Sequence, residues 1–186
     1  MDAIELLENR ESNGKLTDPA PDDATLNDIL RAALRAPDHA ALRPWKVLTL
    51  RGEAREKLGA LFRESTARRD PDADADALAR AARKPLRAPL LLVIAATPTD
   101  HPKVPEVEQV LSAGALAHGI LLGLQARGFA GMWRTGKPAY DPYLKEALGL
   151  QPHDHIVAFL YVGTEAQPCP DKPRPSLEDV VSPWNG

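Results

Sequence analysis

The run "PLLLVIAAT", from Pro89 to Thr97, limits what this chain can fold into more than any other feature of the sequence. It contains no charged residue, yet it has only about half of the ~18 residues that a membrane-spanning helix needs. Its length and its β-branched residues are typical of a buried strand, which Pro98 closes. The run therefore predicts a strand in the core of a globular domain and no membrane span.

The segments around this run predict further helices and strands. Pro37 ends an amphipathic helix near Arg35, and Asp22 or Asp23 caps its start. Other helices are expected over 2–9, with Asp2 as N-cap, over 53–69, from Pro105 to Gly128 and near 143–148, and strands over 45–50, around Trp133 and over 155–163. This order favours an α+β domain with a central sheet flanked by helices rather than a regular βαβ winding.

Two of these helices carry distinctive faces. The second helix places Leu26, Ile29, Leu30, Ala33 and Leu34 on one apolar face. In the long helix, the small residues Ala113, Gly114, Ala115, Ala117 and Gly119 allow close packing of another helix or of a flat group. The charged stretch from Arg68 to Lys84 predicts a solvated loop that leads into a surface helix.

Composition narrows the class of protein. The 186 residues fit one domain, 1–186, and 23 basic against 26 acidic residues give a net charge of −3, which does not favour nucleic-acid binding. The single cysteine, Cys169, permits neither an intramolecular disulfide nor a zinc cluster of thiolates. The N-terminus "MDAIELLENRES" has no apolar run typical of a signal peptide, so we expect a cytoplasmic protein.

The stretch "GMWRTGKP", from Gly131 to Pro138, is one residue short of a phosphate-binding Walker A loop. That loop follows a strand, opens a helix and needs Ser or Thr after the lysine to bind Mg²⁺. Here Pro138 takes that position, and the stretch follows the long helix instead of a strand. We therefore expect no nucleoside-triphosphate site, and no G-x-G-x-x-G segment follows a strand to form a Rossmann site.

The histidines do not indicate a metal site or an acid–base pair. His101, His118, His153 and His155 show neither E-x-x-H nor H-x₃-H spacing on one helix. His118 lies in the middle of the long helix, and we expect its side chain to be packed. His153 and His155 flank the start of a strand, and we expect them to be solvated. We predict no catalytic side chain among them.

Four motifs, taken in order, resemble the FMN-dependent nitroreductase family and in particular its short YdjA-like branch. They are "NRESNGKL", "ALRAPDHAALRPW", "GFAGMWRTG" and "DKPRPSLEDVV", and they extend over nearly the whole chain. Each is weak alone, whereas all four at these spacings are specific. The resemblance implies a nitroreductase-like α+β fold, built as a homodimer with FMN at the interface.

The resemblance also implies site residues. Arg10 and Ser12, with the backbone of Glu11, would bind the FMN phosphate, and Arg174 would reach it from the tail with Lys172 nearby. Met132, Trp133 and Arg134 would line the flavin, mostly through backbone groups and stacking. Without the resemblance, Arg10 and Ser12 would be a surface helix end, Arg174 a basic loop residue and Trp133 a core aromatic.

Arg35 and His39 would reach the flavin of the partner subunit, where positive charge stabilises the reduced ring. The alternatives are a cation on a helix dipole for Arg35 and a loop histidine for His39. Four positions depart from the family pattern, namely Glu11, Gly14, Ala41 and Arg43. Glu11 and Gly14 stand where the family usually has a basic residue, Ala41 stands where it has Asn, and Arg43 stands where it has Gln.

The function implied is an FMN-dependent NAD(P)H oxidoreductase that passes electrons in a ping-pong reaction to electron-poor acceptors such as nitroaromatics or quinones. FMN carries the chemistry, so no catalytic side chain and no metal are expected. Two alternatives stay open: a flavin enzyme of the same fold with another reaction, such as dehalogenation or flavin destruction, and a non-catalytic FMN-binding protein.

Overall fold

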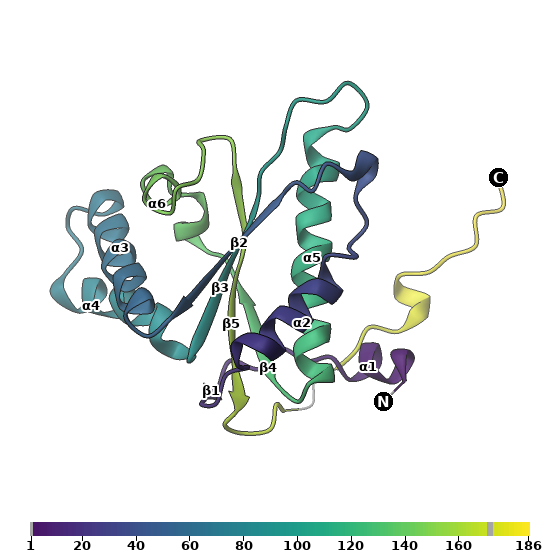
Figure 1. Cartoon of the computed structure of the whole chain (residues 1–186), viewed down its shortest axis with the longest axis horizontal. Coiled ribbons are helices and arrows are strands. Elements are labelled where there is room, and N and C mark those ends of the chain that lie inside the picture. The colour runs from purple at the N-terminus through teal and green to yellow at the C-terminus, as the bar shows by residue number, and fades with distance from the viewer. Residues whose placement is uncertain (1, 171–172) are drawn as a thin grey trace.

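A five-stranded antiparallel sheet stands between two groups of helices in the computed structural model, which describes residues 2–170 and 173–186 (Figure 1). The strands are β1 (Leu16–Thr17), β2 (Trp45–Arg51), β3 (Leu90–Ala96), β4 (Ala130–Arg134) and β5 (His155–Glu165). The helices are α1 (Ala3–Asn9), α2 (Asp23–Ala33), α3 (Glu53–Arg69), α4 (Ala75–Arg83), α5 (Glu106–Ala126) and α6 (Pro142–Ala147). The α+β class and every strand predicted from the sequence are confirmed.

The sheet is built around β3 and β5. β2 pairs with β3, β3 pairs with β5, and both β1 and β4 pair with β5. Every side chain of β3 is at most 1% exposed, because alternate residues face different cores. Leu90, Leu92 and Ile94 pack toward α2 and α5, and Leu91, Val93 and Ala95 pack toward α3 and α6. The continuous apolar run therefore forms a strand covered on both faces.

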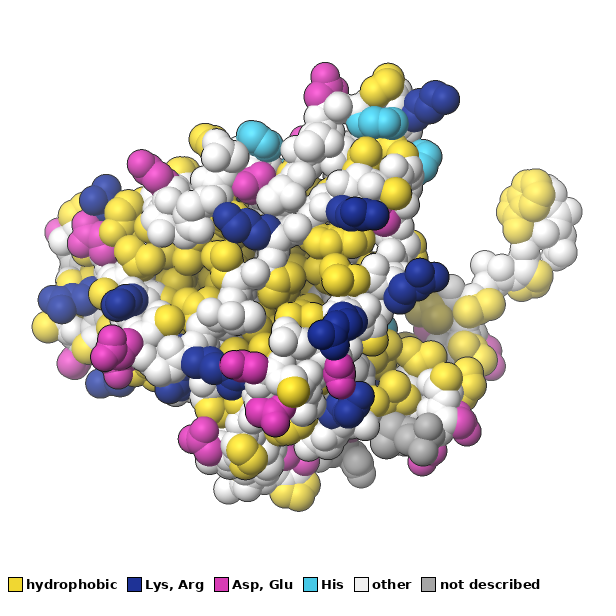
Figure 2. Space-filling view, in the orientation of Figure 1, with side chains coloured by type: hydrophobic (Ala, Val, Ile, Leu, Met, Phe, Trp, Pro, Cys, Tyr) yellow, Lys and Arg dark blue, Asp and Glu magenta, His cyan; other side chains and the backbone are white. Residues whose placement is uncertain are grey.

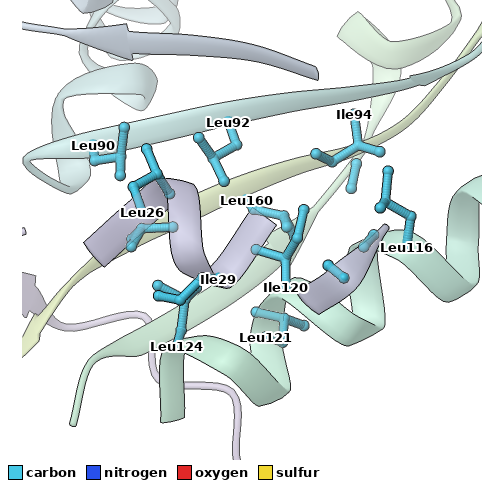
Figure 3. Close-up of a cluster of buried hydrophobic side chains, with 14 residues drawn as sticks. Leu26, Ile29, Leu90, Leu92, Ile94, Leu116, Ile120, Leu121, Leu124 and Leu160 are labelled. Atoms are coloured by element: carbon cyan, nitrogen blue, oxygen red, sulfur yellow. The ribbon is translucent and has the colours of Figure 1, made fainter. Parts of the chain in front are cut away.

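Glycines let α2 lie close to α5. A Cβ atom built on Gly123 would be 2.8 Å from Cγ2 of Ile29, and one on Gly119 would be 3.4 Å from Cα of Ala33. Figure 3 shows Leu26 and Ile29 from α2 meeting Ile120 and Leu124 from α5 over the sheet. The small residues of the long helix thus serve helix packing inside the chain at Gly119 and Gly123.

Local signals fix where the helices start and stop. The Asp2 carboxylate accepts hydrogen bonds from the backbone of Ile4 and Glu5, which completes a capping box at α1. Asp22, the first of the two candidates, caps α2 through the Thr25 amide at 2.8 Å. Gly128 follows the end of α5 with a φ of 79°, a left-handed conformation that favours glycine. The predicted helix boundaries therefore agree with the structure within a few residues.

Some expectations about burial were wrong. His118 is exposed, because it lies on the side of α5 turned away from the sheet. Leu34 is 52% exposed, because α2 ends at Ala33 and the chain turns at its cap. α5 is apolar and long enough to cross a membrane by composition alone, but one side of it forms part of the core between sheet and α2. Its outer face carries Val107, Leu111 and His118, which are exposed, and Gly114 and Leu122, which are partly buried in the single chain.

The C-terminal arm, residues 173–186, extends away from the rest of the molecule (Figure 1). It contains one short 3₁₀ turn, Leu177–Asp179. Its large apolar side chains are exposed, with Leu177 at 73% and Trp184 at 91%. Exposed apolar side chains of this kind are typical of a surface that another protein molecule covers.

Candidate functional site

Three elements bring four of the predicted site residues to one cavity. Arg10 caps the end of α1, Glu11 and Ser12 follow it, and Arg174 arrives from the C-terminal arm. The cavity measures about 380 Å³, and Arg10 donates from Nη1 to Oγ of Ser12 at 3.3 Å. Glu8 also lines it, so two acidic and two basic side chains face the same space. Lys172 lies outside the described residues.

A buried asparagine that the sequence analysis did not single out holds this loop in place. Asn13 is 5% exposed, and its Nδ2 donates to Oε1 of Glu165 at 2.5 Å and to the backbone oxygen of Gln167 at 2.8 Å. Its backbone amide donates to the Gly131 oxygen at 3.2 Å. Asn13 thereby joins the Arg10–Ser12 loop to β4 and to the end of β5. In the sequence, only its position directly after the R-x-S pattern could have indicated this role.

Gly14 and Arg134 share one location. A Cβ atom on Gly14 would lie 3.1 Å from Nη2 of Arg134, so the guanidinium occupies the space that a side chain at position 14 would enter. Position 14 departs from the family pattern because its basic residue is missing. The structure supplies a basic group at that place from β4 instead, from a residue already predicted to line the flavin.

β4 divides its predicted flavin residues between two faces. Trp133 packs toward the α2–α5 core and donates from Nε1 to the Val157 oxygen at 3.1 Å, while Met132 packs toward the α3–α6 core. The Trp133 ring is therefore a core aromatic, the alternative weighed from the sequence. The Gly131 oxygen points away from β5 and accepts from the Asn13 amide. Residues two apart in a strand direct their backbone groups to the same side, so the N–H and C=O of Trp133 also face the edge of β4 that is not paired with β5.

The other predicted pair, Arg35 and His39, lies away from the Arg10 cavity. Arg35 is exposed and lines a space of about 520 Å³ together with Asp38, Ala41 and Arg43. His39 is bound through Nδ1 to Oε2 of Glu108 in α5 at 2.7 Å. The side chains of both partners are about half exposed, so this contact is open to solvent.

The loop between His39 and Arg43 has an unusual backbone. Ala40, Ala41 and Arg43 have φ values of 61°, 53° and 51°, which disfavour residues with a Cβ atom. Oδ2 of Asp38 accepts from the Arg43 amide at 2.8 Å and pins the loop. Such strain, of the order of 1–3 kcal/mol per residue, persists where a structure needs a special shape. Two of the three positions are those that depart from the family pattern.

The length of α5 separates the two groups within one chain. His39 is bound at Glu108, whereas Glu11 and Asn9 line a cavity of about 410 Å³ with Leu121 and Gln125. Residues 108 and 125 of one helix lie roughly 25 Å apart at 1.5 Å per residue. A single copy of the chain does not bring His39 and Arg10 to one ligand.

A family model described as the nitroreductase family matches residues 7–164. The chain belongs to the nitroreductase family. "Putative NAD(P)H nitroreductase YdjA" of Escherichia coli strain K12 is 40% identical over 164 residues, which cover 88% of each protein. A "Putative NAD(P)H nitroreductase" of Haemophilus influenzae is 38% identical over 88% of this chain and 89% of that protein. Membership confirms the resemblance and the enzyme class, an oxidoreductase of nitroreductase type.

Solved structures confirm the nitroreductase-like fold. A nitroreductase-like family protein from Bacillus cereus superimposes with a TM-score of 0.81 at 24% identity and covers 100% of this chain and 97% of its own. A "putative nitroreductase" from Desulfovibrio desulfuricans, solved in complex with FMN, superimposes with a TM-score of 0.72 at 21% identity and covers 97% of this chain and 96% of its own. At these identities the likeness concerns the fold.

Proposed function

We propose that this nitroreductase-family protein is a cytoplasmic FMN-dependent NAD(P)H oxidoreductase that acts on electron-poor acceptors such as nitroaromatics or quinones. When bound, FMN would supply the redox chemistry, with hydride accepted from NAD(P)H in one step and electrons passed to the acceptor in the next. The meeting of Arg10, Ser12 and Arg174 at one cavity carries this proposal. Relatives named NAD(P)H nitroreductases support it.

The residues at this cavity fit a phosphate monoester. Two guanidinium groups supply forked N–H donors and Ser12 supplies a hydroxyl, the groups that bind a dianion. Glu8 and Glu11 reduce the local positive charge, so the cofactor needs further cations. Arg134, whose guanidinium lies beside Gly14, is such a group, and we assign to it the role of the basic residue that position 14 lacks. The outward amide of Trp133 would then meet the flavin as a backbone donor.

The outer face of α5 fits a homodimer that completes the site. Val107, Leu111, Gly114, His118 and Leu122 recur at helical spacing, and none of them is fully buried. If two copies pack α5 antiparallel about Gly114 and Ala115, Glu108 of one subunit lies opposite Leu121 of the other. His39 of the partner subunit, held by that glutamate, then stands near the cavity at Glu11 and Gln125. This pairing removes the roughly 25 Å that separates the two groups in one chain.

The exposed arm supports the same assembly. Leu177, Val180, Val181 and Trp184 are each at least 63% exposed and point to a covering surface. Arg174 is at the root of this arm, so ordering of the arm on a partner would also fix Arg174 at the phosphate.

The test is FMN binding by single and double variants. Arg10→Ala removes a charge-assisted contact of roughly 1.5–3 kcal/mol and should weaken FMN about ten- to hundredfold. Arg174→Ala should weaken FMN by a similar factor, and the double variant by less than the product, because both side chains act on one phosphate. Riboflavin, which lacks the phosphate, is the matched control ligand and should bind all variants alike.

Each outcome decides between the functions. If Arg10→Ala weakens FMN and riboflavin equally, Arg10 is not a phosphate ligand and the assignment fails. Bleaching of the flavin absorbance by NADPH or NADH without air supports the enzyme, whereas a yellow protein that neither nucleotide bleaches would be a passive FMN binder. The strained loop at Ala41 and Arg43 is the observation that favours another reaction of the same fold, and product analysis with halogenated and nitro acceptors tests it.

A further inference from the structure

A cavity formed by α3, α4 and the turn after α4 holds the most one-sided charge among the described cavities. It measures about 490 Å³ and is lined by Thr66, Ala77, Arg80, Ala81, Arg83, Lys84 and Arg87. Four of these side chains are basic, and none is acidic. The cavity at Arg10, by contrast, balances its basic residues with Glu8 and Glu11.

These four cations lack acidic partners. Among residues 2–170 and 173–186, no carboxylate lies within ion-pair distance of Arg80, Arg83, Lys84 or Arg87, although five ion pairs of arginine with aspartate or glutamate form elsewhere. Burial lowers the pKa of Lys84, and the positive charges of Arg87, Arg69 and Lys137 lower it further. The cluster is therefore repulsive as it stands, and an anion would relieve it.

Helix stability explains only part of the cluster. Arg80 and Arg83 lie in the last turn of α4, where cations interact favourably with the helix dipole. Arg87 lies beyond that turn in the 3₁₀ segment Lys84–Arg87, and Lys137 comes from a different loop, after β4. Side chains from separate segments thus converge on one place. Figure 2 shows basic side chains, interspersed with acidic ones, over the region of α3 and α4 on the left.

The cluster reaches toward the predicted flavin residues. Burial raises the pKa of the Tyr161 hydroxyl, and the charges of Arg87 and Arg134 oppose that effect, so both guanidinium groups lie near the same ring. Tyr161 pairs with Met132 across β5 and β4. Arg134 is also the residue beside Gly14. Arg87 of the α4 cavity and Arg134 of β4 therefore both act electrostatically on Tyr161.

We propose that the cluster of Arg80, Arg83, Lys84 and Arg87 is an anion-binding subsite that holds the phosphate groups of the reduced dinucleotide, and thereby favours NADPH over NADH. This inference rests on the proposed function, because it assumes a flavin near β4. A dinucleotide whose nicotinamide meets the flavin places its diphosphate, and in NADPH a further phosphate, some distance away. Four unpaired cations in an open cavity match that concentration of negative charge.

The first experiment measures the anion alone. FMN-loaded protein, in which the Arg10 cavity is filled, is titrated with pyrophosphate by calorimetry at low salt. The double variant Arg80→Gln/Arg83→Gln should lose about tenfold or more in affinity. The double variant Lys57→Gln/Arg63→Gln removes two exposed positive charges from α3 outside the cavity and should stay within about twofold. Equal affinity of wild type and the Arg80/Arg83 variant would overturn the subsite.

The second experiment assigns the anion to the dinucleotide. Stopped-flow reduction of the bound flavin should show an apparent Kd for NADPH raised about tenfold in the Arg80/Arg83 variant, a smaller rise for NADH, and an unchanged rate at saturation. Unchanged NADPH affinity would overturn the assignment. If the purified protein binds no flavin, the proposed function fails; pyrophosphate titration in an Arg10→Ala background then still reports on the cluster alone.

Discussion

The contact between Gly123 and Ile29 gives the sharpest test of how α2 is seated on α5. A methyl group on Gly123 would begin 2.8 Å from Cγ2 of Ile29, whereas carbon atoms in contact prefer about 3.5–4.0 Å. Ile29, 2% exposed in the core, would have to move by roughly 1 Å. Overpacking of this kind costs about 1–3 kcal/mol, and the better helix propensity of alanine returns about 1 kcal/mol. Gly123→Ala should therefore destabilise the protein by roughly 0–2 kcal/mol.

A double-mutant cycle makes this prediction specific to the contact. Ile29→Ala alone opens a cavity and should cost about 2–5 kcal/mol. In the double variant, the new methyl group enters space that Ile29 has left, so the total should be about 1–2 kcal/mol smaller than the sum of the two single costs.

Urea unfolding of all four proteins, at one protein and FMN concentration, measures these differences. Additivity within about 0.5 kcal/mol would show that Gly123 and Ile29 do not touch and that α2 is seated differently. A Gly123→Ala protein more stable than wild type would refute the close approach directly.

The remaining predictions concern the interface and the start of α2. Gly114→Leu adds a side chain where the single chain has nothing within 4 Å, so it should leave the fold intact but weaken dimerisation in sedimentation experiments. The control Ala126→Leu, at an exposed position near the end of α5, should not weaken dimerisation. Equal dimerisation of the two variants would exclude the proposed pairing. The hydrogen bond from Thr25 lowers the pKa of Asp22, so the carboxylate stabilises the fold above about pH 4 and loses this contribution as the pH falls through its lowered pKa. The stability of wild type relative to Asp22→Asn, which keeps a cap at every pH, should thus fall between about pH 5 and pH 2; a difference independent of pH would contradict it.

Much of the fold could be predicted because its signals are local. The β3 run, the Asp2 and Asp22 caps and the turn at Gly128 each depend on a few neighbouring residues, and each is present in the structure. His118 was assigned wrongly because α5 is apolar nearly all round, so periodicity does not show which side faces outward. Which side is covered depends on α2 and the sheet, which the local sequence does not encode.

The candidate site was predictable only where a motif supplied it. Arg174 is far from Arg10 and Ser12 in the sequence, and the family resemblance, not spacing, predicted that they meet. The pairing of Arg134 with Gly14 and the clamp made by Asn13 depend on how the N-terminal loop crosses β4. Neither segment alone has a sequence pattern that predicts this contact between the loop and β4. For the basic cavity at α4, the charged stretch from Arg68 to Lys84 predicts only a solvated loop and a surface helix, because charge along the sequence does not show that side chains meet at a cavity.

The helix α5 also restricts how this chain can change over time. Loss of one residue between Ser112 and Gly119 would turn everything after it by about 100° and draw it back by about 1.5 Å. Gly119 and Gly123 would leave α2, and Leu124 would leave the core, at the same time. Descendants of this sequence can therefore exchange side chains along α5 far more easily than they can change its length. Insertions and deletions should instead accumulate in the turn 70–74 between α3 and α4, which carries no such register.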